Sequence, residues 1–154
     1  MTADPAPDMT AADRTLATQR LLPAAPAQVW QALTDPAQLA RWWGPAGFSN
    51  EVQHCDLREG GTWHFWMVAP DGQRYWNECR FTTLQPERHW ALAHTVAPHF
   101  TLSLTLAAEG SGTRLHWAQC FETAALRQGL EGICRPANEQ NLDRLAALLA
   151  APAA

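Results

Sequence analysis

Four polar residues stand where the periodicity of the chain predicts an inward-facing side chain, and they are the first candidates for chemistry. They are Asn77, His94, Gln119 and Asn138. An imidazole makes directional hydrogen bonds and changes its charge near neutral pH, whereas a buried amide costs ~1–3 kcal/mol if it is left unpaired. The four side chains therefore predict either polar anchors for a bound molecule or a hydrogen-bond network that serves the core alone. For His94, the choice is between a core histidine with satisfied nitrogens and a group that holds a ligand or transfers a proton.

Large aromatic side chains share the predicted inward faces with these polar groups. They are Trp63, Phe65, Trp90 and Trp117. Each brings a large apolar surface, so any space that they enclose has apolar walls. A space of that kind with a few polar groups suits a small, mostly apolar or amphipathic molecule. The four aromatic and the four polar residues form the candidate ligand-binding set.

No motif in the sequence indicates metal binding or nucleophilic catalysis. The histidines are His54, His64, His89, His94, His99 and His116. They lack H-x-x-x-H and H-E-x-x-H spacing, so the sequence predicts no metal site. The cysteines, at 55, 79, 120 and 134, form no C-x-x-C pair, which favours reduced thiols packed as small apolar groups. Without a G-x-S-x-G motif or a phosphate-binding loop, no serine nucleophile and no organic cofactor are expected.

Composition is that of a globular protein. Of 154 residues, 47% are hydrophobic and 17% are charged, with a net charge of −4. Scattered basic residues and a negative charge predict no nucleic-acid binding, and the apolar runs are far shorter than the ~20 residues of a membrane span. Residues 1–13 are rich in Ala, Pro and Asp, which predicts a disordered tail, and they lack the pattern of a signal peptide, which predicts a cytoplasmic location. Residues 14–154 are expected to form one domain.

Two short helices are predicted near the start of that domain, over Pro26–Leu33 and Pro36–Trp42. Proline is tolerated at a first helical position, because its missing N–H would have no intrahelical partner there. Asp35 precedes the second helix as a side-chain cap. Both helices have an apolar face that needs cover.

Alternating apolar and polar residues predict strands on either side of these helices. The expected strands are Arg14–Leu22, Phe48–Leu57, Thr62–Ala69, Arg74–Leu84, Arg88–Val96, a stretch from Phe100 to the turn at Glu109–Gly112, and Thr113–Phe121. Short turns such as Asp56–Gly61 and Pro70–Gly72 join consecutive strands as antiparallel neighbours. The last six strands therefore predict a meander.

The chain ends in a helical period of about 3.6 residues. Gly129, Gly132 and Pro136 predict a break or kink near Ile133–Arg135, and a firm helix from Pro136 to about Ala150. The fold class is α+β: a strand, two short helices and six strands in a curved antiparallel sheet, wrapped around a long C-terminal helix. A curved sheet that holds a helix leaves space between them for a small apolar ligand.

Several short motifs follow one another along the chain. They are Val-Trp-Gln-Ala-Leu-Thr-Asp-Pro at 29–36, Trp-Trp-Gly-Pro at 42–45, Asp-Leu-Arg at 56–58, Gly-Gly-Thr-Trp at 60–63, Pro-Asp-Gly at 70–72 and Gly-Thr-Arg-Leu at 112–115. Together they resemble the SRPBCC (START-like, helix-grip) superfamily. Within it they look like the branch homologous to the activator of heat-shock-protein-90 ATPase, bacterial single-domain type. The resemblance implies a helix-grip fold over about residues 14–150, in a superfamily of lipid carriers, hormone receptors and cyclases.

Three functions are compatible with these residues. The first is binding of a small, mostly apolar molecule in a cavity between the sheet and the C-terminal helix. The second is a cofactor-independent enzyme of the cyclase or lyase type, in which His94 moves a proton on a bound carbonyl compound. The third, suggested by the family name, is a co-chaperone-like or stress-response role through interaction with another protein. A homodimer through the face that carries His64 and Trp66 is a further expectation.

Overall fold

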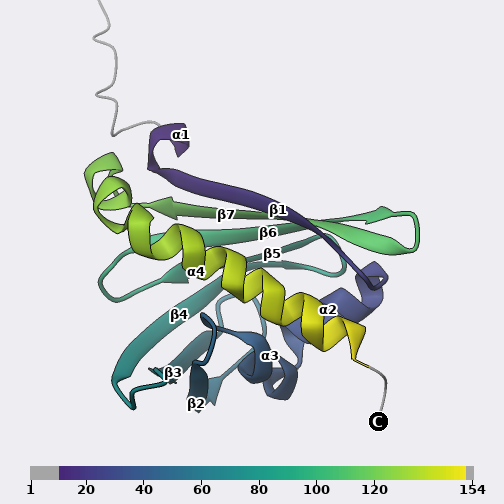
Figure 1. Cartoon of the computed structure of the whole chain (residues 1–154), viewed down its shortest axis with the longest axis horizontal. Coiled ribbons are helices and arrows are strands. Elements are labelled where there is room, and N and C mark those ends of the chain that lie inside the picture. The colour runs from purple at the N-terminus through teal and green to yellow at the C-terminus, as the bar shows by residue number, and fades with distance from the viewer. Residues whose placement is uncertain (1–10, 152–154) are drawn as a thin grey trace, which may run out of the picture.

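Seven antiparallel strands form one curved sheet in the computed structural model, which describes residues 11–151 (Figure 1). The strands are β1 (Thr15–Leu22), β2 (Ser49–Cys55), β3 (Thr62–Val68), β4 (Arg74–Gln85), β5 (His89–His94), β6 (Phe100–Glu109) and β7 (Gly112–Phe121). The helices are α1 (Ala11–Arg14), α2 (Pro26–Thr34), α3 (Pro36–Trp42) and α4 (Ala124–Ala150). The spatial order β1-β7-β6-β5-β4-β3-β2 confirms the predicted six-strand meander, with the first strand paired to the last.

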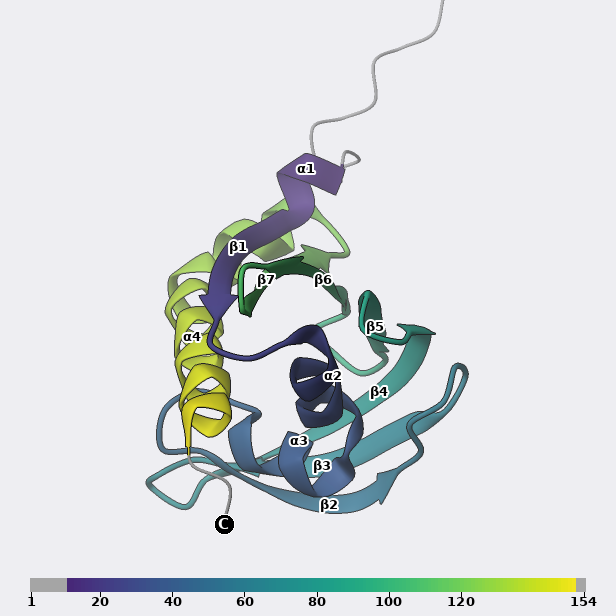
Figure 2. The same cartoon turned by 90° about the vertical axis from the view of Figure 1, so that its right-hand side faces the viewer.

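The sheet curls around α2 and α3, and α4 closes its open side (Figure 2). The predicted α+β fold class is therefore confirmed. Residues 11–13 begin a short helix instead of ending a disordered tail, and the prediction for residues 1–10 lies outside the described part of the chain. Within residues 11–151, no helix is both long and apolar enough to cross a membrane.

The paired helices α2 and α3 form where their proline and capping signals predict. Pro26 and Pro36 are at the helix starts, and the Asp35 side chain accepts a hydrogen bond from the backbone N–H of Ala37 at 3.1 Å. The apolar face of this pair is buried inside the curved sheet. The indole N–H of Trp42 in α3 donates to the carbonyl of Ala32 in α2 at 2.9 Å and joins the two helices, and that of Trp90 in β5 donates to the carbonyl of Leu33 at 3.0 Å and joins the pair to the sheet.

The long helix α4 is continuous through Pro136, so of the break or kink predicted near Ile133–Arg135 the break is absent. Pro136 cannot donate to the carbonyl of Gly132, but both residues are exposed, so water can hydrate that carbonyl. Packing of α4 against β1, β7, α2 and α3 offsets the lost hydrogen bond. The first turns of α4 run at an angle to the rest in both views, which fits the expected effect of a proline (Figures 1 and 2).

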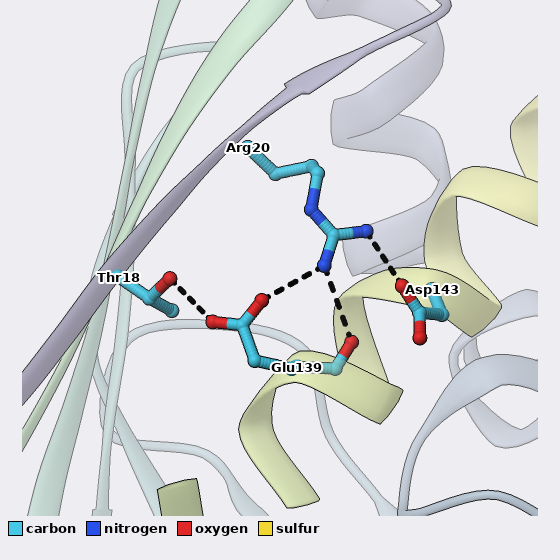
Figure 3. A network of polar contacts seen from close by, with 4 residues as sticks. All are labelled: Thr18, Arg20, Glu139 and Asp143. Carbon is cyan, nitrogen blue, oxygen red and sulfur yellow. Dashed lines mark hydrogen bonds and ion pairs between the residues drawn. The ribbon is translucent and has the colours of Figure 1, made fainter. Parts of the chain in front are cut away.

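A polar network joins α4 to the edge strand β1 (Figure 3). The guanidinium of Arg20 donates to the carboxylates of Glu139 and Asp143, at 2.9 and 2.8 Å. The hydroxyl of Thr18 donates to the other carboxylate oxygen of Glu139. The hydrogen bond from Thr18 and the nearby charge of Arg20 lower the pKa of Glu139. Because Glu139 and Asp143 are one turn apart, a single arginine holds both to the sheet.

Replacing Arg20 with methionine tests this connection. We expect Arg20→Met to lower the free energy of unfolding by about 1 kcal/mol, because two carboxylates lose their partner while the apolar stem is kept. Urea denaturation followed by circular dichroism measures the change. Arg114→Met is the matched control: it removes an ion pair with Glu109 in the β6–β7 hairpin and should cost at most about 0.5 kcal/mol. Equal losses in the two variants would contradict a special role for Arg20.

Candidate functional site

A cavity of about 190 Å³ lies between the sheet and α4. Side chains of β3, β4, β5, β6 and β7 line it on one side, and side chains of α4 line it on the other. Trp43 and Pro45, from the segment between α3 and β2, complete the wall. The space occurs where the sequence analysis expects it, between the curved sheet and the C-terminal helix.

Six of the eight candidate binding residues line this cavity. They are Phe65, Asn77, His94, Trp117, Gln119 and Asn138. They come from four strands and one helix, so the inward parity of each element brings together residues that are up to 73 positions apart in the sequence, from Phe65 to Asn138.

Trp63 and Trp90, in contrast, do not line the cavity. Both are buried in the core, Trp63 stacked on Phe65 with ring centroids 4.1 Å apart and Trp90 edge-on to Phe81 at 5.8 Å. Their parity was predicted correctly as inward, but another side chain separates them from the cavity.

That side chain is Trp43, which the sequence analysis did not include among the binding residues. Its ring centroid lies 5.1 Å from Trp63, 6.0 Å from Trp90 and 6.2 Å from Trp117. Trp43 follows the last residue of α3, so the helical period does not predict where it points. Gly44, with a φ of 101°, turns the chain directly after it. The Trp-Trp-Gly-Pro motif was the available signal, because a buried tryptophan beside a glycine turn indicates a segment folded back onto the core.

Side chains of α4 hold the segment that carries Trp43. One guanidinium nitrogen of Arg144 donates to the carbonyls of Trp43, Gly44 and Pro45, at 2.9, 3.0 and 3.1 Å. The side-chain oxygen of Asn141 accepts from the backbone N–H of Gly44 at 2.8 Å. Burial lowers the pKa of Arg144, whose partners here are carbonyl dipoles and not carboxylates. The position of Trp43 is therefore set by α4.

Two polar clusters face the cavity. In one, the Asn138 amide nitrogen donates to the side-chain oxygen of Gln119 at 3.0 Å. In the other, Nδ1 of His94 lies 2.7 Å from the carbonyl oxygen of Pro98, and Nε2 lies 2.9 Å from the side-chain oxygen of Asn77. Burial has the largest effect and lowers the pKa of His94, whereas hydrogen bonds to the backbone at Pro98 and Val96 oppose it. The net shift is downward, so the neutral form of the His94 ring is favoured near neutral pH.

Two thiols complete the wall as apolar groups. Burial raises the pKa of Cys79 to about 12 and also raises that of Cys134. Both therefore stay protonated near neutral pH and are poor nucleophiles. Among residues 11–151, no three His, Cys, Asp or Glu side chains are grouped so that they could hold a metal ion. The site can enclose a molecule and offer it hydrogen bonds.

The face expected to mediate self-association lies elsewhere, on the outer side of the sheet. His64 and Trp66 are partly exposed there. Trp66 lies 4.9 Å from Trp76 between ring centroids, and the guanidinium carbon of Arg74 lies 4.7 Å from the Trp66 ring. A homodimer through this face remains a prediction.

Comparison with known proteins agrees with the architecture. A crystal structure of a protein from Nitrosomonas europaea superposes with a TM-score of 0.81 at 26% identity, covering 90% of this chain and 95% of that chain. One from Chromobacterium violaceum gives 0.79 at 29% identity, covering 90% and 99%. A protein from Arthrobacter aurescens gives 0.84 at 22% identity, covering 95% and 91%, which shows the fold alone. A search of curated proteins found no match.

The family model described as "Activator of Hsp90 ATPase homolog 1-like protein" matches residues 23–150. This match extends from the residues before α2 to the last turn of α4, and so includes the cavity and most of the sheet. The chain belongs to the family of Activator of Hsp90 ATPase homolog 1-like proteins.

Proposed function

We propose that this protein binds a small, mostly apolar molecule in the cavity between the sheet and α4. The observation that carries the proposal is an apolar space of about 190 Å³ with several almost fully buried amides in its wall. A cavity of roughly 150 Å³ is large enough to bind benzene in a protein core. The space therefore fits a molecule about the size of one ring with few substituents.

The burial of amide side chains in the cavity wall favours a ligand-binding role for them over a role in the stability of the core alone. Gln119, Asn138 and Asn141 are 7%, 8% and 7% exposed. Burying amides costs free energy unless they are hydrogen-bonded, and a core that needed only to be stable would contain apolar side chains at these positions. Polar groups beside an unfilled apolar space are the usual arrangement of a ligand site.

The enzyme alternative depends on His94. Each of its ring nitrogens already faces a protein oxygen, and the ring is stacked on Phe100 with centroids 4.7 Å apart. Proton transfer to a ligand would require one of these contacts to break, so the geometry favours a positioning role for His94. A co-chaperone-like role, suggested by the family name, would use an outer surface and does not account for the buried amides in the cavity wall.

A cavity-filling variant tests the proposal. Ala137 of α4 lines the cavity, so Ala137→Leu places extra carbons in the space that a ligand would occupy. We expect the affinity for toluene, measured by calorimetry, to fall at least about tenfold, which is the loss of about 1.4 kcal/mol of ligand burial. Native mass spectrometry of protein purified from its own cells should show a retained small molecule in wild type and less of it in the variant.

Ala147→Leu is the matched control, because it makes the same change at an exposed position of the same helix. Toluene should bind this variant as it binds wild type. If toluene does not bind the wild-type protein, or if both variants bind it equally well, the cavity is not a binding site.

The pH dependence of stability tests the state of His94. Burial lowers the pKa of His94 below the ordinary value of a histidine, so at mildly acidic pH the folded state binds fewer protons than the unfolded state. The free energy of unfolding then rises with pH. His94 contributes a stability that is complete above its unfolded pKa and is lost as the pH falls below it.

We therefore expect wild type to lose stability between about pH 7 and about pH 5, and His94→Gln to lose less over the same range. Urea denaturation at a series of pH values gives the slope. His116→Gln, at an exposed position of β7, should retain the wild-type slope. A slope unchanged by His94→Gln would contradict a neutral, buried His94.

A further inference from the structure

The polar groups of the cavity wall are not all matched by protein partners. The side-chain oxygen of Asn141 accepts from the N–H of Gly44. Because a backbone N–H can only donate, this contact fixes which end of the amide faces Gly44. Within residues 11–151 the amide nitrogen of Asn141 has no hydrogen-bond partner, although the residue is only 7% exposed. Asn141 thus has a donor to offer.

A second unmatched donor belongs to Trp117. Its side chain lines the cavity and is 2% exposed, and its indole N–H is buried without a hydrogen-bond partner among the described residues. An indole nitrogen can only donate. A buried donor without a partner costs about 1–3 kcal/mol, so Trp117 also favours an acceptor nearby.

The pair formed by Asn138 and Gln119 does not change the excess of unmatched donors over unmatched acceptors. Their mutual hydrogen bond uses one donor and one acceptor, which leaves one amide nitrogen and one amide oxygen. Together with Asn141 and Trp117, the wall therefore offers more donors than acceptors. A ligand that complements it has an acceptor as its polar group.

The wall also excludes a charged ligand. None of the described side chains that line the cavity is an arginine, aspartate or glutamate. His94, Cys79 and Cys134 are held in their neutral forms by burial. An ion placed there would lose its hydration without gaining a counter-charge, which is far more costly than burial of a neutral polar group.

We propose that the ligand is a neutral molecule the size of one ring, whose polar group is a carbonyl-type acceptor, as in a ketone, ester or lactone. This inference rests on the proposed function and names its ligand class. Asn141 is the first donor assigned to the carbonyl oxygen. The second is the indole N–H of Trp117, which is closed to water-sized molecules in this structure, so its ring has to shift when the ligand binds. Phe65, Met67 and Leu92 supply apolar wall around the ring of the ligand.

Three probes of similar size separate the ligand classes: ethylbenzene is apolar, acetophenone adds a carbonyl, and benzoate adds a charge. We expect acetophenone and ethylbenzene to bind the wild-type protein and benzoate to bind at least about tenfold more weakly than acetophenone. Calorimetry gives the three dissociation constants. The ratio of acetophenone affinity to ethylbenzene affinity then reports the contribution of the carbonyl.

Two variants remove the donors one at a time. Trp117→Phe loses the indole N–H and keeps an aromatic ring. Asn141→Asp keeps an oxygen for the N–H of Gly44 but replaces the free amide nitrogen with an oxygen. In each variant we expect the acetophenone-to-ethylbenzene ratio to fall about three- to tenfold, the usual effect of one hydrogen bond.

The matched control is Gln140→Glu. Gln140 is the neighbouring amide of α4 and accepts from the N–H of Ala46 at 3.0 Å, but it does not line the cavity. The change from amide to carboxylate is the same as in Asn141→Asp, so a ratio close to wild type separates loss of the donor from a general effect of charge on α4.

Each outcome decides one of the two proposals. A ratio that is the same in wild type, Trp117→Phe and Asn141→Asp overturns the carbonyl class while ethylbenzene binding upholds the cavity as a binding site. Tighter binding of benzoate than of acetophenone also overturns it. Binding of none of the three probes removes the proposed function together with this inference.

Discussion

The concave face of the curved sheet has to be covered, and the rest of the structure depends on how this is done. At one end, α2 and α3 fill the concavity with apolar side chains and produce a solid core around Trp63, Phe81 and Trp90. At the other end, α4 lies over the sheet without filling the space beneath it. Trp43 stands between the two regions and contacts Trp63 and Trp90 on one side and Trp117 on the other. The indole of Trp43 thus lies at the boundary between the packed core and the cavity.

Two arginines fix α4 relative to the elements on either side of it. Arg20 of β1 pairs with carboxylates of α4 near the surface, where water screens the charges. Arg144 of α4 donates instead to backbone carbonyls of the segment that carries Trp43. This second contact is more buried and has no carboxylate, so it depends on the carbonyl dipoles being correctly placed. Cavity shape and helix position are therefore coupled through Arg144.

The sequence predicted the fold closely because its signals are local and agree with one another. Alternation identified the strands, and proline with Asp35 marked the short helices. Parity along a strand also predicted which face each site residue occupies, but it carries no information on depth: Trp63, Trp90 and Trp117 share the inward parity, and only Trp117 reaches the cavity. Of the break or kink expected before Pro136, only the change of direction is present (Figure 1), because packing of the whole helix outweighs one lost hydrogen bond. Trp43 was missed because it directly follows the end of α3, where neither the period of 3.6 residues of a helix nor the alternation of a strand predicts the direction of a side chain.

A purely structural polar network and a ligand site differ in how completely their groups are matched. The pair of Asn138 and Gln119 is compatible with both a structural network and a ligand site, since the two side chains hydrogen-bond to each other. Asn141 is half explained, because its oxygen holds Gly44 while its nitrogen has no partner within residues 11–151. The indole N–H of Trp117 is explained by neither packing nor pairing. A network selected for stability alone would match these donors or replace them with apolar groups, because each buried, unmatched donor lowers the stability of the fold. Their retention beside an apolar space is what a site shows when its remaining partner comes from outside the chain.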